Sequence, residues 1–164
     1  MNFNVMPHDP ALARPDKLTK LVAVFDQFHS VIAQLNDPTA KRLVDNWAEV
    51  RRQYVASVGV PRSVLASGME QGLRETPMLL QSMSAEARKS AAQALAEAIS
   101  SHYPIFAAKD AERLANIKAR GSIRSEGEFH LIRHQVDLLE GEPSQQQELR
   151  LLYELVRKFE ARGT

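Results

Sequence analysis

The sequence predicts an all-α protein, an antiparallel helical bundle of about six helices with a C-terminal helical hairpin. Apolar residues recur three and four positions apart along most of the chain, which is the period of an α-helix with one buried face. Valine and isoleucine rarely alternate with polar residues, as they would in half-buried strands. Residues that cap or break helices separate the periodic stretches, so we expect short connections between the helices.

The length of 164 residues fits one domain. We expect residues 15–164 to form a single helical domain, within which the hairpin at 122–163 is a candidate semi-independent subdomain. Residues 1–14 include Pro7 and Pro10, and we expect them to form a flexible N-terminal tail.

The start of the chain lacks the cationic and apolar regions of a secretory signal peptide. No uncharged apolar stretch approaches the roughly 20 residues that a membrane-spanning helix needs. The chain has no cysteine, which excludes a disulfide framework and fits a reducing compartment. These observations predict a cytoplasmic protein that does not bind a membrane.

The first helix is predicted by an apolar seam that runs from Leu18 to Leu35 with spacings of 3, 4, 3, 4 and 3 residues. Asp37 and Pro38 then supply the N-cap and the first residue of a second helix, which ends at Gly59. The break between the two helices is short, so they should lie antiparallel. Trp47 lies on the second seam and is expected in the core.

Residues 59–84 depart from this pattern, because they contain three of the seven glycines, two of the eight prolines and three of the five methionines. Gly68 and Gly72 each weaken a helix by about 1 kcal/mol. Three interpretations stay open: a connector packed on the bundle, a partner-binding segment, or a tight helix contact at Gly68-x-x-x-Gly72. Flexible, methionine-rich surfaces adapt to partners. The candidate partner-binding residues in this segment are Met69, Met78, Leu79, Leu80 and Met83.

Two helices are expected between residues 84 and 121. Ser84 is the predicted N-cap of an alanine-rich helix that ends near Pro104, and Pro104 begins the next helix. Gly121 is its predicted C-terminal cap. Alanine on many faces permits close helix contacts, so we expect the alanine-rich helix in the core beside the N-terminal pair.

The C-terminal hairpin is predicted by two capping boxes. Ser125 is followed three residues later by Glu128, and Ser144 by Gln147. Gly141 and Gly163 stand where the C-terminal caps of the two helices belong.

The first hairpin helix has an apolar arc that is wider than one partner helix can cover. Leu131 and Leu138 lie roughly 160–180° from Phe129 at about 100° per residue. This outer face packs either on the same bundle or on a second protein or subunit. Leu131 and Leu138 are therefore further candidates for partner binding.

The stretches 123–129, 136–139, 148–152 and 155–160 resemble the helical hairpin that precedes the DNA-binding domain of HigA-type antitoxins. The resemblance covers residues 123–160 and implies a helical module for dimer or partner contacts. The antitoxins continue into a helix-turn-helix that we do not find in this sequence, so the resemblance does not imply DNA binding.

Two sets of residues point to other chemistry. His130 and His134 are four residues apart and Asp137 follows three later, so they share one helical face as weak candidate ligands of a metal ion. The alternative is a solvated polar face. Lys118, Arg120 and Arg124 surround Gly121 and are candidate phosphate contacts for a nucleic acid.

Charge and motifs decide among the function classes. The net charge of +1 gives no broad basic field, although residues 61–124 carry nine basic and six acidic groups and residues 125–164 carry five and eight. The zinc-protease, Walker A, nucleophile-elbow and Rossmann patterns are absent from the sequence. We therefore expect a non-enzymatic protein-interaction or regulatory module that binds a protein partner or forms a homodimer and needs no cofactor. The alternatives are a nucleic-acid accessory protein and a metal-dependent helical enzyme.

Overall fold

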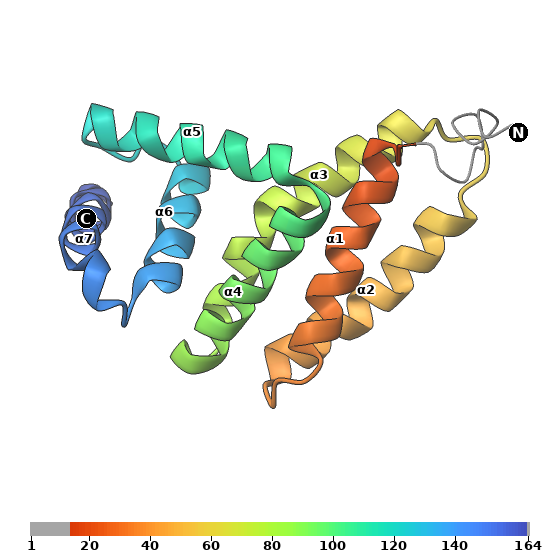
Figure 1. The fold of residues 1–164 in the computed structure, drawn as a ribbon, viewed down its shortest axis with the longest axis horizontal. Helices are drawn as coiled ribbons and strands as arrows, with labels where there is room; N and C mark the ends of the chain where they lie inside the picture. The colour runs from red at the N-terminus through yellow and green to blue at the C-terminus, as the bar shows by residue number, and fades with distance from the viewer. Residues whose placement is uncertain (1–13, 164) are drawn as a thin grey trace, which may run out of the picture.

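The computed structural model describes residues 14–163, which form seven α-helices and two 3₁₀ helices, without a β-strand in this part of the chain. The predicted all-α class is confirmed. In chain order the elements are α1 (Lys17–Ile32), α2 (Pro38–Ala56), α3 (Arg62–Leu79), η3 (Leu80–Ser82), α4 (Ala85–His102), α5 (Pro104–Arg120), α6 (Glu126–Leu139), η4 (Pro143–Gln145) and α7 (Gln146–Arg162) (Figure 1).

The predicted N-terminal tail lies, apart from Arg14, outside the described residues. Among the helices of residues 14–163, none is both long and apolar enough to cross a membrane.

The helix that the sequence does not predict is α3, which occupies most of the irregular segment 59–84. Gly68 and Gly72 lie inside it, and Pro77 lies in its last turn. The helix forms despite its weak propensity because it buries an apolar face that includes Ala66, Met69 and Leu73. Most helical stability in proteins comes from this kind of packing rather than from propensity.

The helix starts follow the predicted caps, with one exception. Asp37 accepts from the backbone N–H of Thr39, and Ser84 accepts from that of Ala87. Ser125 accepts from the Glu128 N–H at 3.1 Å, while the Glu128 carboxylate bonds the N–H of Arg124 instead of that of Ser125. The predicted box at Ser144 is wrong, because residues 143–145 form η4 and α7 begins at Gln146 without a side-chain cap.

The glycines at helix ends behave in two ways. Gly121 caps α5 with φ +80°, and Gly141 follows α6 with φ +86°, both left-handed conformations that favour glycine. Gly163 is the C-cap of α7 but stays right-handed, with φ −80°.

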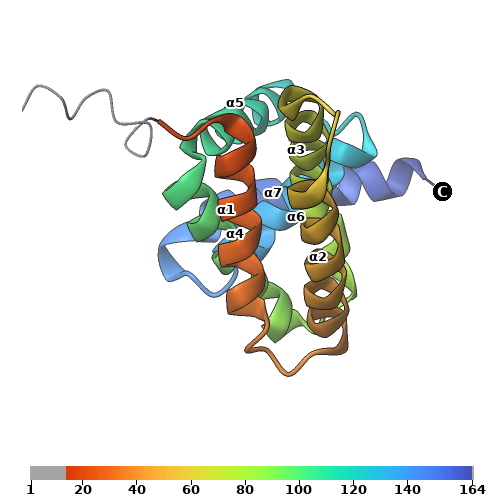
Figure 2. The ribbon, with the colours of Figure 1, turned by 90° about the vertical axis from the view of Figure 1, so that its right-hand side faces the viewer.

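Helix α1 is the centre of the N-terminal part of the fold and packs against α2, α3 and α4. Figure 2 shows α1 and α4 on one side of this unit and α2 and α3 on the other. The predicted core role of the alanine-rich helix is confirmed, because Ala91, Ala94 and Ala98 of α4 are buried against this core. Their small side chains permit the close approach of α4 to α1.

Buried apolar residues form two clusters rather than one. The first cluster consists of buried residues from α1 through α4 together with Tyr103 and with Phe106 of α5. The second consists of Ile117 of α5, Ile123 and buried residues of α6 and α7. Helix α6 contacts α7 and α5 and also packs on α3 and α4. Its wide apolar arc is therefore covered by the same bundle, and Leu131 is buried there.

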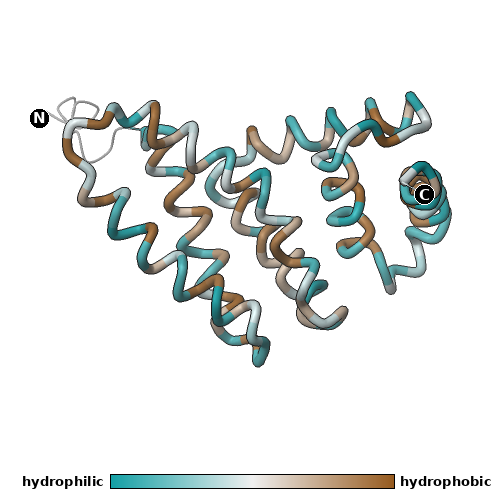
Figure 3. The backbone as a smooth tube through the Cα atoms, turned by 180° about the vertical axis from the view of Figure 1, so that it is seen from behind, coloured by the Kyte–Doolittle hydropathy of each residue, from teal (hydrophilic) through white to brown (hydrophobic). Residues whose placement is uncertain are grey.

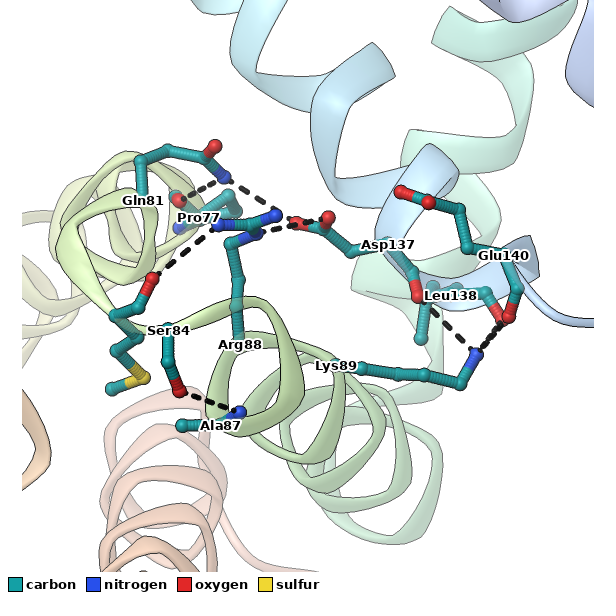
Figure 4. Close-up of polar contacts among 10 residues, drawn as sticks. Pro77, Gln81, Ser84, Ala87, Arg88, Lys89, Asp137, Leu138 and Glu140 are labelled. Carbon is teal, nitrogen blue, oxygen red and sulfur yellow. Dashed lines mark hydrogen bonds and ion pairs between the residues drawn. The ribbon is translucent and has the colours of Figure 1, made fainter. Parts of the chain in front are cut away.

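A polar cluster fastens α6 to α4 (Figure 4). Arg88 Nε donates to Asp137 Oδ1 at 3.0 Å, and Gln81 Nε2 donates to Asp137 Oδ2 at 3.4 Å. The Lys89 ammonium donates to the backbone carbonyls of Leu138 and Glu140, where α6 ends. A cation at this position also complements the negative end of the helix dipole. We call this cluster the α4–α6 clamp.

We predict that Arg88→Ala lowers the free energy of unfolding by about 3–5 kcal/mol. The Arg88 and Asp137 side chains are only 16% and 4% exposed, so the variant leaves the Asp137 carboxylate buried without its cation. Urea denaturation measures the loss. Arg52→Ala is the matched control, because Arg52 pairs with Glu49 on the surface and its loss should cost less than about 0.5 kcal/mol. Equal midpoints for the two variants would contradict the assignment.

Candidate functional site

An apolar groove of about 190 Å³ lies where α2 and α3 flank α1. Figure 3 views this side of the fold, with α2 and α3 in front of the apolar turns of α1. We call it the aromatic groove. Its lining residues are Phe25, Phe28 and His29 of α1, Leu43, Asn46, Trp47, Val50 and Tyr54 of α2, and Gly68, Met69, Gly72, Thr76 and Leu79 of α3.

The groove contains a stack of three rings. Phe25 and His29 lie one turn apart on α1, and both stack on Trp47 of α2, with centroid distances of 5.0 and 5.5 Å. Trp47 Nε1 donates to Asp26 Oδ1 at 2.9 Å, and Arg51 donates to the same carboxylate. The indole N–H is thus satisfied and its ring is held in place. The prediction that Trp47 belongs to the core is confirmed.

Two glycines form part of the α3 wall of the groove. A Cβ at Gly72 would lie 3.8 Å from Phe25 Cζ, and a Cβ at Gly68 would lie 2.9 Å from the Tyr54 hydroxyl oxygen. Tyr54 thus reaches from α2 to the backbone of α3. The tight contact at Gly68-x-x-x-Gly72, one of the three interpretations of this segment, is present at Gly68.

Beyond Tyr54 the apolar surface continues into a second hollow of about 280 Å³. Its walls include Leu18 and Val22 of α1, Leu65 of α3, and the residues at the α2–α3 connection. Tyr54 lines both hollows. Large apolar side chains are exposed around them, namely Val55, Val58, Val60, Val64, Met78 and Leu79.

His29 is the one histidine among the described residues that line the groove. Its Nδ1 lies 2.7 Å from the carbonyl oxygen of Phe25. A carbonyl only accepts, so Nδ1 carries the proton and Nε2 of the neutral ring is an acceptor. Burial lowers the pKa of His29 below its ordinary value, which favours the neutral ring at neutral pH.

The predicted partner-binding residues separate into two groups. Leu80, Met83 and Leu131 are buried in the protein core outside the aromatic groove, so the expectation that they form an exposed docking surface is corrected. Met69 is also buried, but it lines the aromatic groove. Methionine and leucine in an irregular segment resemble an adaptable surface, and Leu131 lies on a wide apolar arc, but the packing of α3 and α6 covers these side chains. Met78 and Leu79 are exposed, Leu79 also lines the groove, and Leu138 is half-buried.

The predicted metal ligands do not converge. Asp137 is paired with Arg88, His134 lines a separate cavity, and His130 Nε2 faces Glu126 at 3.7 Å. Within residues 14–163, no group of three or more His, Asp or Glu side chains is placed to hold a metal ion. The expected solvated face is also wrong, because this side of α6 packs on α3 and α4.

The predicted basic patch is largely neutralised within the chain. Lys118 Nζ lies 2.7 Å from a carboxylate oxygen of Glu148. Arg120 pairs with Glu128 and donates to the carbonyl of Ser122. Arg124 is exposed. The acidic hairpin therefore occupies two of the three cations that were candidates for phosphate contacts.

A polar cavity of about 160 Å³ between α3, α4, α5 and α6 holds His134. Arg74, Glu75, Asp110 and Arg113 share its lining. Burial lowers the pKa of His134 to about 4 and raises the pKa of Asp110 above its ordinary value. The periodicity of α6 alone did not reveal this environment, since the helices that cover His134 are distant in sequence.

Sequence reasoning missed the aromatic groove itself. It placed Trp47 in the core and recognised the spacing of Gly68 and Gly72, but neither signal shows that the two elements face each other across α1.

Comparisons of the chain with protein-family models, with curated proteins and with solved structures give no match. The likeness of residues 123–160 to the antitoxin hairpin stays a prediction.

We predict that protonation of His134 destabilises the fold below neutral pH. The folded-state pKa of about 4 lies below the ordinary 6.5, so between these values the unfolded chain binds a proton that the folded chain does not. Stability therefore falls as the pH falls through this window. Between pH 7 and pH 4.5, the free energy of unfolding of His134→Gln should fall by about 2–3 kcal/mol less than that of the unmodified chain. Urea denaturation at the two pH values measures this difference. Equal losses in both chains would contradict the prediction.

Proposed function

We propose that this chain is a non-enzymatic helical interaction module that binds an apolar segment of a protein partner in the aromatic groove. The observation that carries the proposal is the open groove itself, in which stacked aromatic rings lie below a wall lacking side chains at Gly68 and Gly72. Concave, mostly apolar sites with a few polar groups are typical of binding sites.

The form of the groove favours a helical segment of the partner. It lies between two helices of 19 and 18 residues, each about 27–29 Å long at 1.5 Å per residue. An amphipathic helix of the partner could place successive apolar side chains in the two hollows on either side of Tyr54. The exposed Met78 and Leu79 near one end of α3 would extend the apolar contact.

The other function classes receive less support. The cations considered for nucleic-acid binding are mostly paired with the C-terminal hairpin, and Asp137, considered for metal binding, is paired with Arg88. The partner in the groove is either another protein or a second copy of this chain, and the experiment below separates these cases.

We predict that a photo-crosslinking amino acid at Asn46, on the exposed rim of the groove, forms an adduct with the partner in the native cell. The same group at Glu112, an exposed residue of α5 outside the groove lining, should form none. Mass spectrometry of the adduct identifies the partner segment, and an adduct of the chain with itself identifies a homodimer.

Gly72→Leu should abolish the adduct, because its side chain enters the groove beside Phe25. Ser67→Leu is the matched control, since Ser67 is exposed on the same helix and lines neither hollow. Circular dichroism confirms that both variants are folded. An adduct that survives Gly72→Leu at full yield would contradict the proposal.

A further inference from the structure

We propose that the aromatic groove selects a tryptophan side chain of the protein partner, whose indole N–H donates a hydrogen bond to Nε2 of His29. This inference rests on the proposed function of the groove and names the residue that the partner would insert. Three features of the groove support it, namely a free acceptor, a stacked aromatic surface and a lining without ionic charge.

The free acceptor is defined by the hydrogen bonds of His29. Its Nδ1–H is taken by the carbonyl of Phe25, which leaves the lone pair of Nε2 for another donor. Nε2 has no hydrogen-bond partner among the described residues, and although His29 is only 8% exposed, this nitrogen is not fully enclosed. Within residues 14–163, His130 Nδ1 is the one fully buried side-chain nitrogen or oxygen without a partner. His29 lines the groove, and the proposal places the donor of a molecule that enters there against this acceptor.

The surface around this acceptor is suited to an aromatic ring. Phe25, Trp47 and His29 are stacked with interplanar angles of 23° and 11° around Trp47. Offset stacked or edge-to-face aromatic contacts add about 0.5–1.5 kcal/mol beyond the burial of area. Among the described lining residues, the other aromatic rings are those of Phe28 and Tyr54, so an inserted ring meets aromatic side chains from both α1 and α2.

The polar groups of the groove distinguish tryptophan from other anchors. The described lining residues include no Asp, Glu, Lys or Arg, so nothing there would pair with a charged side chain of the partner. Phenylalanine and leucine have no donor for Nε2. The tyrosine hydroxyl donates but also brings oxygen lone pairs, whereas the indole N–H is a donor only, as the lone pair of His29 Nε2 requires.

The experiment compares indole with 1-methylindole, which has a methyl group in place of the N–H hydrogen. Both are titrated into the full chain and followed by NMR through the indole N–H resonance of Trp47, the single tryptophan. One hydrogen bond of about 1 kcal/mol corresponds to roughly a fivefold difference in Kd, so indole should bind about fivefold more tightly.

Two variants assign this difference to His29. His29→Phe keeps an aromatic ring but removes the acceptor, so the ratio of the two Kd values should fall to about one. Thr76→Val is the matched control, because the Thr76 hydroxyl also lies in the lining but already donates to the carbonyl of Gly72. Its ratio should stay near that of the unmodified chain. If His29→Phe does not fold, the ¹⁵N shift of His29 Nε2 serves instead, and it should move with indole but not with 1-methylindole.

The outcomes separate this inference from the proposed function. Equal affinity of the unmodified chain for both probes overturns the tryptophan inference while leaving the groove as a binding surface. A ratio that persists in His29→Phe also overturns it, since the preference would then come from the size of the methyl group. If neither probe binds, the inference fails, and the crosslinks from Asn46 still decide the proposed function.

Discussion

The α4–α6 clamp is the contact that decides where the C-terminal hairpin lies. Asp137 is a buried carboxylate, and its charge is tolerable only because Arg88 and Gln81 donate to it. The Lys89 ammonium donates hydrogen bonds to backbone carbonyls at the C-terminal end of α6. With α6 held in this place, Leu131 packs into the bundle and α6 covers one side of α3. The opposite side of α3 remains available to form a wall of the groove.

Helix α1 connects this architecture to the proposed binding surface. It packs on α4 on one side and on α2 and α3 on the other. The base of the groove is therefore a packed helix rather than a loop. The Asp26 carboxylate fixes the edge of Trp47 away from the groove and leaves its ring stacked with Phe25 and His29. A site built in this way needs little ordering when a partner binds, which reduces the entropy cost of association.

The small net charge of the chain hides opposite excesses of charge in two adjacent segments, which pair with each other. Residues 61–124 have an excess of basic groups and residues 125–164 an excess of acidic groups, and the two meet at Arg88–Asp137, Lys118–Glu148 and Arg120–Glu128. Charges that would look like a phosphate-binding patch in the sequence therefore serve to dock the hairpin.

Local patterns in the sequence determined the all-α class, most helix bounds, the caps at Asp37, Ser84 and Ser125, and the burial of Trp47. These properties depend on residues within a few positions of one another, so periodicity and capping chemistry suffice to predict them. The tertiary structure decided that α3 is a helix, that Met69, Met83 and Leu131 are buried, and that Asp137 faces Arg88. It also created the aromatic groove, because Trp47, His29 and Gly72 meet only when three helices pack around one another. Such long-range juxtapositions depend on the packing of whole faces, which no local pattern in the chain encodes.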